Sequence, residues 1–307
     1  YLTRQNYKKI DQLQVLNTDA VLLALEIPKT NDKTELAAEQ LLASIHGILR
    51  DAEQLKNNGG VQEHLSFEIV SVNGSIRFYV WTPKILQNFI EGQIYSQYPT
   101  VQIFEAKTDY IQEAQLKPVV YSAEIGFEVD PLAGITGTLA KLDGTNSQMW
   151  MQVLVRPIAD DWHKESDKWI KSVKEGKKPF KFDLKWFLQV FEALWKAPEA
   201  SEKKDDKKEL SERDKTRVSK AEEKATKLGY RVKIRLAYLG DDETTARLQI
   251  QALTGTFKQF NSTNLNGFKM VNATFDRANL AKFENREFFD GGFVLNIQEL
   301  ASIWHLP

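Results

Sequence analysis

The 307-residue chain contains no cysteine, so it can form no disulfide bond, no thiolate nucleophile and no cysteine-based metal site. Histidine is scarce, and the four present are spread along the chain: His46, His64, His163 and His305. None stands at the H-x-x-x-H or H-E-x-x-H spacing that places two imidazoles on one helix face. The acidic pairs Asp160-Asp161 and Asp241-Asp242 are typical of helix starts. The sequence therefore predicts no catalytic residue, no bound cofactor and no metal site in this chain.

The chain also lacks an excess of either charge and any long apolar run. Its 41 basic and 42 acidic side chains nearly cancel, so no strong overall field attracts nucleic acid. No stretch reaches the roughly 18 uncharged apolar residues that a membrane-spanning helix needs. We expect a cytoplasmic protein, which segments outside this chain could hold at the inner face of a membrane, and only weak or indirect contact with DNA.

The first hundred residues alternate between strand and helix patterns. The hairpin signal is Asn73-Gly74, since both positions of such a turn tolerate positive φ. Thr82 and Pro83 suit the start of a helix, and Pro99 ends it. The predicted order is strand 20–27, helix 34–55, strand 65–70, strand 76–81, helix 82–98 and strand 101–104. This is the split βαβ or ferredoxin-like order, and it predicts a first domain over residues 1–110.

The same order returns in the second part of the chain. The predicted elements are strand 119–129, helix 131–142, strand 149–156, strand 230–239, helix 242–260 and strand 268–274. The sequence therefore predicts an α+β protein of two tandem ferredoxin-like domains. The second would span residues 111–275 and be interrupted by a helical, charged insertion at about 160–228.

The first half of this insertion predicts a strongly amphipathic helix. Its apolar stripe includes Phe182, Trp186, Phe187, Phe191 and Trp195, bulky side chains of the kind enriched at binding hot spots. Such a helix can dock on its own sheet, bind a partner or lie on a membrane surface. From Lys196 to Lys227, basic and acidic residues alternate with hardly a large apolar one, which favours a solvated segment over a phosphate-binding patch. We interpret the stripe as a partner-binding surface.

Residues 276–307 end in a pattern that is unusual for a chain terminus. A predicted strand at Phe293–Ile297 runs into an amphipathic helix that carries Ile303, Trp304 and Leu306. Ends of domains are usually polar and frayed. The expectation is that this strand and helix lead into a further domain, and that these three side chains contact it.

Four stretches of the sequence are similar to one family. They are Asn296–Pro307; Leu25–Lys29 with Ala37–Gln40 and Ser44–Gly47; Asp130–Leu132 with Gln152–Pro157 and Trp162; and Asn264–Phe268. In these stretches the chain resembles the N-terminal, non-motor region of DNA-translocating ATPases of the HerA/FtsK type, which include conjugative coupling proteins of type IV secretion systems. The resemblance implies a bacterial protein with an assembly and substrate-handling role. It also implies contacts with its own C-terminal motor domain, further copies of itself, and secretion-machine proteins or a relaxase.

The phosphate-binding loop of such motors, G-x-x-x-x-G-K-[ST], is absent. The chain by itself is therefore not expected to be an enzyme, although the parent protein would be an ATPase. Two alternatives stay open. One is a stand-alone nucleic-acid-binding module that uses Phe78, Tyr79 and Trp81, although core packing explains these residues better. The other is a small-molecule enzyme on the same fold.

Overall fold

The computed structural model describes residues 19–307 with gaps. The gaps are residues 30, 32, 73, 115–118, 128–146, 160–166, 168–169, 172–214, 216–217, 220–221, 225, 258–267 and 289–290. The chain divides into two compact units, residues 1–159 with 227–307, and residues 160–226. The second unit is close to the insertion expected at about 160–228. The candidate partner-binding residues Phe182, Trp186, Phe187, Phe191 and Trp195 lie outside the described residues.

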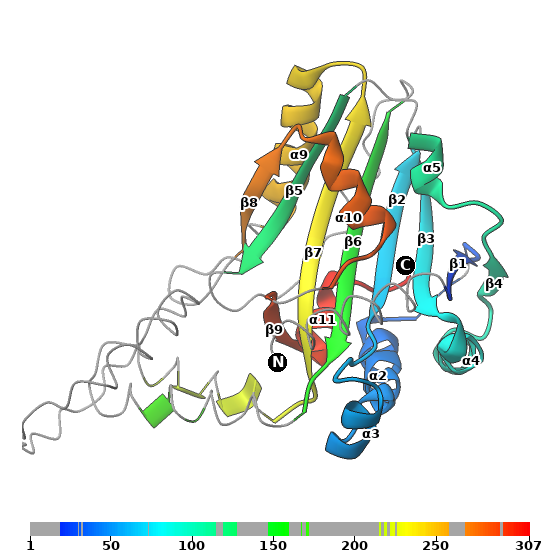
Figure 1. The fold of residues 1–307 in the computed structure, drawn as a ribbon, viewed down its shortest axis with the longest axis vertical. Helices are drawn as coiled ribbons and strands as arrows, with labels where there is room; N and C mark the ends of the chain where they lie inside the picture. Colours follow the sequence, from blue (N-terminus) through cyan, green and yellow to red (C-terminus); the bar gives the residue numbers. More distant parts are fainter. Residues whose placement is uncertain are drawn as a thin grey trace, which may run out of the picture. The chain divides into compact units, whose positions relative to one another are not determined.

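Within the first unit, nine strands of the described residues form one sheet, and each of their pairings is antiparallel (Figure 1). The strands are β1 (Ala20–Glu26), β2 (Leu65–Val72), β3 (Ser75–Pro83), β4 (Gln102–Glu105), β5 (Val119–Phe127), β6 (Gln148–Pro157), β7 (Gly229–Gly240), β8 (Phe268–Thr274) and β9 (Phe293–Asn296). Their order is β4-β1-β3-β2-β6-β7-β5-β8, and β9 pairs with β7. The predicted α+β class is therefore correct.

Strands β2 and β6 lie at the centre of the sheet and pair along their whole overlap, from Leu65 opposite Val155 to Val72 opposite Gln148. Nearly every residue of both strands is buried, because protein covers both faces of the sheet at this point. This pairing joins strands from the two predicted domains. The boundary expected at residue 110 therefore does not separate two compact units.

The first face of the sheet is covered by helices α2 (Glu35–Ile45), α4 (Gln87–Gln97), α9 (Glu243–Phe257) and α11 (Ile297–Ile303). Alternate strand residues point to this face, as the period of a strand requires. They include Leu23, Phe67, Val153 and Leu236, all of them fully buried. Short helices connect the elements: η1 (His46–Ile48), α3 (Ala52–Asn57) and η2 (Lys84–Leu86).

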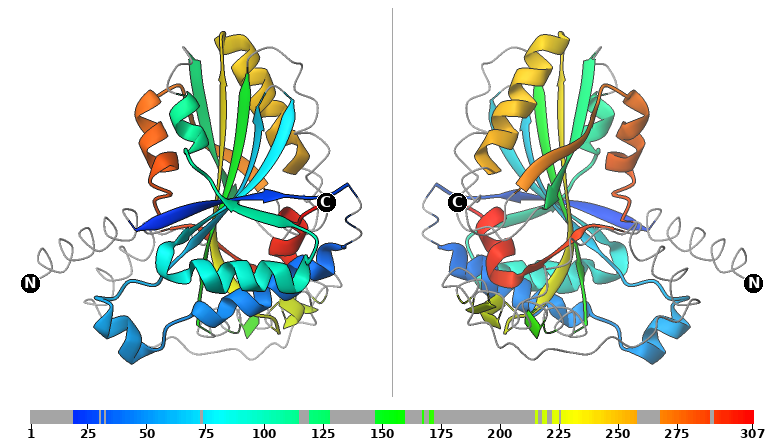
Figure 2. Two further views of the ribbon diagram at one scale, coloured as in Figure 1. Left: turned by 90° about the vertical axis from the view of Figure 1, so that its right-hand side faces the viewer. Right: turned by 90° about the vertical axis from the view of Figure 1, so that its left-hand side faces the viewer.

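The second face carries a smaller apolar cluster under α5 (Tyr110–Ala114), η5 (Arg277–Asn279) and α10 (Leu280–Glu284). Figure 2 shows α5 and α10 on one side of the sheet and α9 on the other. The buried members of this cluster include Tyr79, Trp81, Trp150 and Phe283. The other set of alternate strand residues is thus buried as well.

Two predicted helix boundaries were wrong. The helix expected over 34–55 ends at Ile45, and α3 starts separately because the Asp51 side chain accepts a hydrogen bond of 2.8 Å from the Gln54 N–H. The helix expected from Thr82 begins only at Gln87, since Thr82 and Pro83 still pair with β1. The hairpin was predicted correctly: Val72 lies opposite Ser75, and Gly74 has a φ of 79°.

Three C-terminal side chains that were expected to contact a further domain lie in the core of this chain. Ile303 and Trp304 are 1% exposed and Leu306 is 0% exposed, and all three belong to the core of the first face. The Trp304 and Phe67 rings lie 4.3 Å apart between centroids. Because these side chains fill the core of this chain, they cannot also present a surface to another domain. Among the residues that the structure describes, the helices are too short or too polar to span a lipid bilayer.

Candidate functional site

A row of polar side chains crosses the centre of the second face. Glu68 on β2 lies opposite Gln152 on β6, which lies opposite Arg235 on β7. The first two are 0% exposed and Arg235 is 3% exposed. Glu124 on β5 lies opposite Arg235, and the closest approach of the two charged groups is 3.9 Å. Burying charged groups is costly unless they are paired, so partners are expected above this row.

The partners come from residues 276–288, here called the strap, which cross the second face (Figure 1). The strap starts at Asp276, whose side chain accepts a hydrogen bond of 2.9 Å from the Ala278 N–H. Short helix α10 then directs Leu280 and Phe283 onto the sheet, where the Phe283 ring lies 6.1 Å from Trp150. After α10 the backbone turns through Arg286, whose φ is 43°.

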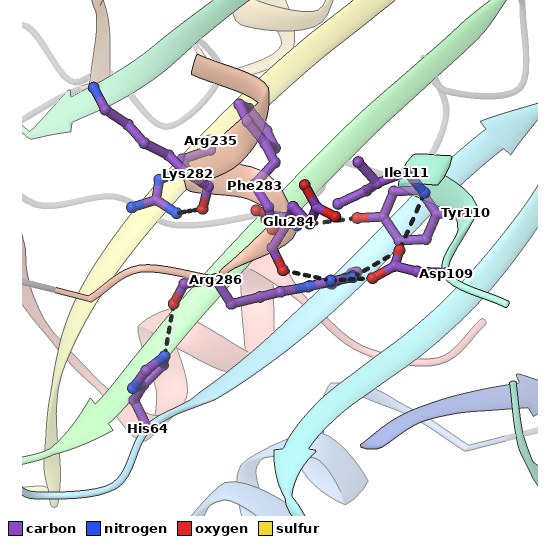
Figure 3. A network of polar contacts seen from close by, with 11 residues as sticks. His64, Asp109, Tyr110, Ile111, Arg235, Lys282, Phe283, Glu284 and Arg286 are labelled. Atoms are coloured by element: carbon purple, nitrogen blue, oxygen red, sulfur yellow. Dashed lines mark hydrogen bonds and ion pairs between the residues drawn. The ribbon is translucent and has the colours of Figure 1, made fainter. Parts of the chain in front are cut away.

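Arg286 is the main contact between the strap and the row. Its guanidinium donates to both carboxylate oxygens of Glu68, at 2.9 and 3.0 Å, and to both carboxylate oxygens of Asp109. One further bond of 3.0 Å goes to the carbonyl of Glu284, and the Tyr110 ring centroid lies 5.5 Å from Arg286 Cζ. Figure 3 shows the extended Arg286 side chain reaching Asp109. A side chain that is only 1% exposed is thus fully hydrogen-bonded.

The sheet also holds the strap by its backbone carbonyls. Gln152 Nε2 donates to the Phe283 carbonyl and to the Tyr110 hydroxyl, both at 3.1 Å. Arg235 donates to the Lys282 carbonyl at 2.8 Å and to the Glu287 carbonyl. Polar side chains of the row therefore fix the backbone of the strap as well as the Arg286 side chain.

His64 adds a contact from the residue before β2. Its Nε2 lies 2.7 Å from the Arg286 carbonyl and must donate, because a carbonyl only accepts. The ring stacks on Trp81 at 5.1 Å and lies 5.5 Å from Phe288. Figure 3 shows His64 and Asp109 at opposite ends of Arg286.

Burial and neighbouring charge shift the pKa values of this site in opposite directions. Desolvation by burial lowers the pKa of His64 to about 4, and nearby cations such as Arg156 act in the same direction. Burial opposes the charge of Arg286, but Glu68 and Asp109 outweigh it, so the pKa of Arg286 lies well above its ordinary value. The site therefore holds a neutral imidazole beside a permanent guanidinium cation.

This arrangement suits fixation of a chain segment better than catalysis. Its carboxylates are occupied by Arg286, its histidine is buried, and the described residues contain no group of three or more potential metal ligands. A hollow elsewhere in this unit is lined by Lys33, Thr34, Leu36, Ala37, Gln40, Ser96 and Gln97. The aromatic residues of the nucleic-acid alternative, Phe78, Tyr79 and Trp81, are 8%, 7% and 5% exposed. In this structure they are packing residues and form no open stacking surface.

Sequence analysis missed the residues of this site. The signal was a charged or amide residue inside an apolar strand: Glu68 stands between Phe67 and Ile69, and Gln152 between Met151 and Val153. Strand alternation places each on the face opposite its apolar neighbours. The role of Arg286 had no comparable local signal.

A second set of contacts, here called the C-terminal junction, joins α2, α11 and the adjoining ends of β6 and β7. The Tyr230 hydroxyl donates 2.6 Å to the Leu42 carbonyl, and His46 Nε2 lies 3.2 Å from the carbonyls of Ile158 and Gly229. Asn31 Nδ2 donates to the Pro307 carbonyl at 2.6 Å. Helix α11 starts at the capping box in which the Asn296 and Glu299 side chains each accept the other residue's N–H.

Fold and sites together define an α+β protein built on one large antiparallel sheet, with a strap fastened across one face and a C-terminal helix packed into the other. The family whose sequence model matches residues 3–307 is described as "Domain of unknown function (DUF8128)". The match covers nearly the whole chain, so this protein belongs to that family. Comparison with curated proteins gives no match.

Proposed function

We propose that this chain is the N-terminal, non-motor region of a HerA/FtsK-type DNA-translocating ATPase of conjugation or secretion. In this role it assembles subunits and presents the substrate, while a C-terminal motor domain performs the ATP chemistry. Its partners are that motor domain, further copies of itself, and secretion-machine proteins or a relaxase, with DNA contacted weakly or indirectly. Segments outside this chain would hold it at the inner face of the membrane.

The fold proposed for this role is a pair of ferredoxin-like repeats that share one sheet. The first set of strands has the spatial order β4-β1-β3-β2, and the second set has the order β8-β5-β7-β6. Numbered within each set, both orders are 4-1-3-2. Helix α4 follows the third strand of the first set, as α9 follows the third strand of the second. These correspondences support an internal duplication, with the two repeats meeting at the β2–β6 pair.

The observation that carries the functional proposal is the position of the stretches similar to the ATPase family. Asn296–Pro307 includes α11, Ala37–Gln40 and Ser44–Gly47 lie in or beside α2, and Gln152–Pro157 ends β6. Helices α2 and α11 contact each other, and His46 Nε2 lies 3.2 Å from the carbonyl of Ile158, the residue directly after Gln152–Pro157. Three of the stretches therefore lie in or next to the C-terminal junction, which supports a common structural role for them, and we propose that this role is rigid attachment of the motor domain.

The insertion is the proposed partner-binding element, through Phe182, Trp186, Phe187, Phe191 and Trp195. Its place in the chain supports this assignment, because it leaves and re-enters the sheet between neighbouring strands. Pro157 lies opposite Tyr230, so a short turn would be enough to join β6 and β7. Long insertions at such positions are often functional.

The test is to read the gene beyond the codon for Pro307 and to assay the resulting protein. A phosphate-binding loop within the next few hundred codons, together with DNA-stimulated ATP hydrolysis by the longer product, would support the proposal. The 307-residue chain alone should neither bind nor hydrolyse magnesium-ATP. A stop codon directly after Pro307, or ATP turnover by the chain alone, would contradict it.

A further inference from the structure

We propose that Glu68, Asp109 and Tyr110 form a guanidinium-binding site that the chain fills with its own Arg286. This contact holds the strap closed over the second face, and the strap is a lid that opens separately from the rest of the sheet. The ligand class is a guanidinium cation, which Arg286 of the same chain supplies in this structure. This inference does not depend on the proposed motor association.

The geometry of the site is selective for a guanidinium group. Glu68 accepts from Arg286 Nε and Nη2 on one edge of the planar group, and Asp109 accepts from Nη1 and Nη2 on another. The Tyr110 ring adds a cation–π contact. An ammonium group has three donors arranged around one atom, so it cannot meet two carboxylates in this fork-like manner.

The carboxylates belong to parts of the chain other than the strap. Glu68 is on the central strand β2 and Asp109 directly precedes α5, whereas Arg286 is 218 and 177 positions further along the chain. The two carboxylates are thus held by β2 and by the segment before α5, and the strap contributes only the guanidinium group. A phosphate ligand is excluded by the same two carboxylates, which would repel it.

The strap has the features of a locally opening segment. Its α-helix α10 spans only five residues, too few to be stable without the sheet. At its C-terminal side, Gly291 and Gly292 have φ values of 97° and 86°, conformations that other residues rarely adopt. Its hold on the sheet comes from Leu280, Phe283 and Phe288 together with the polar contacts of the row.

The first experiment uses Arg286→Ala, which keeps Cβ and removes the part of the side chain that corresponds to N-ethylguanidinium. We expect the variant to melt at a lower temperature than the wild type. Millimolar N-ethylguanidinium should restore most of the lost melting temperature, whereas ethylammonium at the same concentration should not. Wild-type protein, whose site is filled, should show no such shift.

The matched control is the double variant Glu68→Gln/Arg286→Ala, which keeps the cavity and removes one carboxylate. It should respond to N-ethylguanidinium much less than the single variant. Equal rescue in both, or rescue of the single variant by ethylammonium, would overturn the assignment of the site.

The second experiment tests the lock in the wild-type protein and does not require any variant to fold. Amide hydrogen exchange reports local opening as a separate unit. The N–H groups of Asn285, Arg286 and Glu287 bond to carbonyls within the strap, at 2.9, 3.1 and 3.2 Å. We expect them to exchange at least tenfold faster than amides of β2 and β6. Exchange of strap and central strands at the same rate, through global unfolding alone, would contradict the lid.

Discussion

Arg286 and Glu68 lie 218 positions apart in the sequence, yet the guanidinium of the first donates hydrogen bonds of 2.9 and 3.0 Å to the two carboxylate oxygens of the second. Both side chains are at most 1% exposed. A buried ion pair of this kind adds little net stability, because desolvation offsets the attraction, but removing one partner leaves a buried charge unpaired. Its main effect is therefore to fix where the strap docks.

Replacing Glu68 by Gln should lower the free energy of unfolding by about 3 kcal/mol, which is the lower end of the range observed when one partner of a buried ion pair is removed. Glutamine keeps the size of the side chain, so the effect isolates the charge. Denaturant unfolding measures it. Glu105→Gln, a matched change on the exposed residue at the end of β4, should be close to neutral. Equal effects of the two changes would show that the Glu68 charge is not needed.

Trp304→Ala should destabilise the protein by about 3–5 kcal/mol, the cost of truncating a large buried aromatic side chain. Trp304 is 1% exposed and packs on Phe67, whereas Ile85 is 81% exposed. Ile85→Ala is therefore the control and should change stability by less than about 0.5 kcal/mol. If Trp304→Ala left the thermal transition unchanged, the assignment of this tryptophan to the chain's own core would be wrong.

Stability should fall on acidification through the range set by His64. The pKa of this residue is about 4 in the folded chain, against an ordinary value of 6.5, because burial disfavours the charged ring. Between these values the unfolded chain binds a proton that the folded chain does not. The difference amounts to about 3 kcal/mol, lost as pH falls from near 6.5 to near 4.

The comparison that isolates this effect is His64→Gln, whose amide can still donate to the Arg286 carbonyl but does not titrate. Unfolding free energies of both proteins should be measured at several pH values across that window. The variant should lose less stability on acidification than the wild type. Parallel pH profiles would show that His64 is already protonated, or titrates normally, in the folded protein.

Gly292→Ala should destabilise the protein by roughly 2 kcal/mol or more, because the residue has positive φ and the new Cβ would lie 2.6 Å from the Val232 carbonyl oxygen. Gly255→Ala is the opposite case. Gly255 lies in α9 with no atom within 4 Å of the added Cβ, so alanine should stabilise by up to about 1 kcal/mol. Melting temperatures that move in the same direction for both variants would contradict this reading of the two sites.

Replacement of residues 160–226 by a short Gly/Ser turn should leave a protein that still unfolds cooperatively. The Ile158 N–H already donates to the Gly229 carbonyl at 3.2 Å, so the two strand ends are held together without the insertion. The same deletion should abolish association with the rest of the proposed secretion machine. A broad or absent thermal transition would instead assign the insertion to the core of the sheet unit.

Most of the local structure follows from the amino-acid sequence alone. Runs of apolar, β-branched and aromatic residues predicted the strands of both halves, and the β8 prediction over residues 268–274 agrees with the structure to the residue. The turn at Gly74 followed from local backbone preferences. These features depend on neighbours within a few positions, which is why a single sequence reveals them. Helix starts were less certain, as at Gln87, because a cap or a strand pairing several residues away can shift them.

The way in which these elements combine depends on long-range contacts in the folded chain. The pairing of β2 with β6 joins the two predicted domains into one sheet. The C-terminal amphipathic helix was predicted, and Trp304 after it packs inward on Phe67. An amphipathic stripe shows that a helix buries one face but does not show against what. Glu68, Gln152, Arg235 and Arg286 form a site only because strand register and the strap bring them together. Such contacts join positions far apart in the chain, and they depend on the packing of the whole molecule, which no local pattern records.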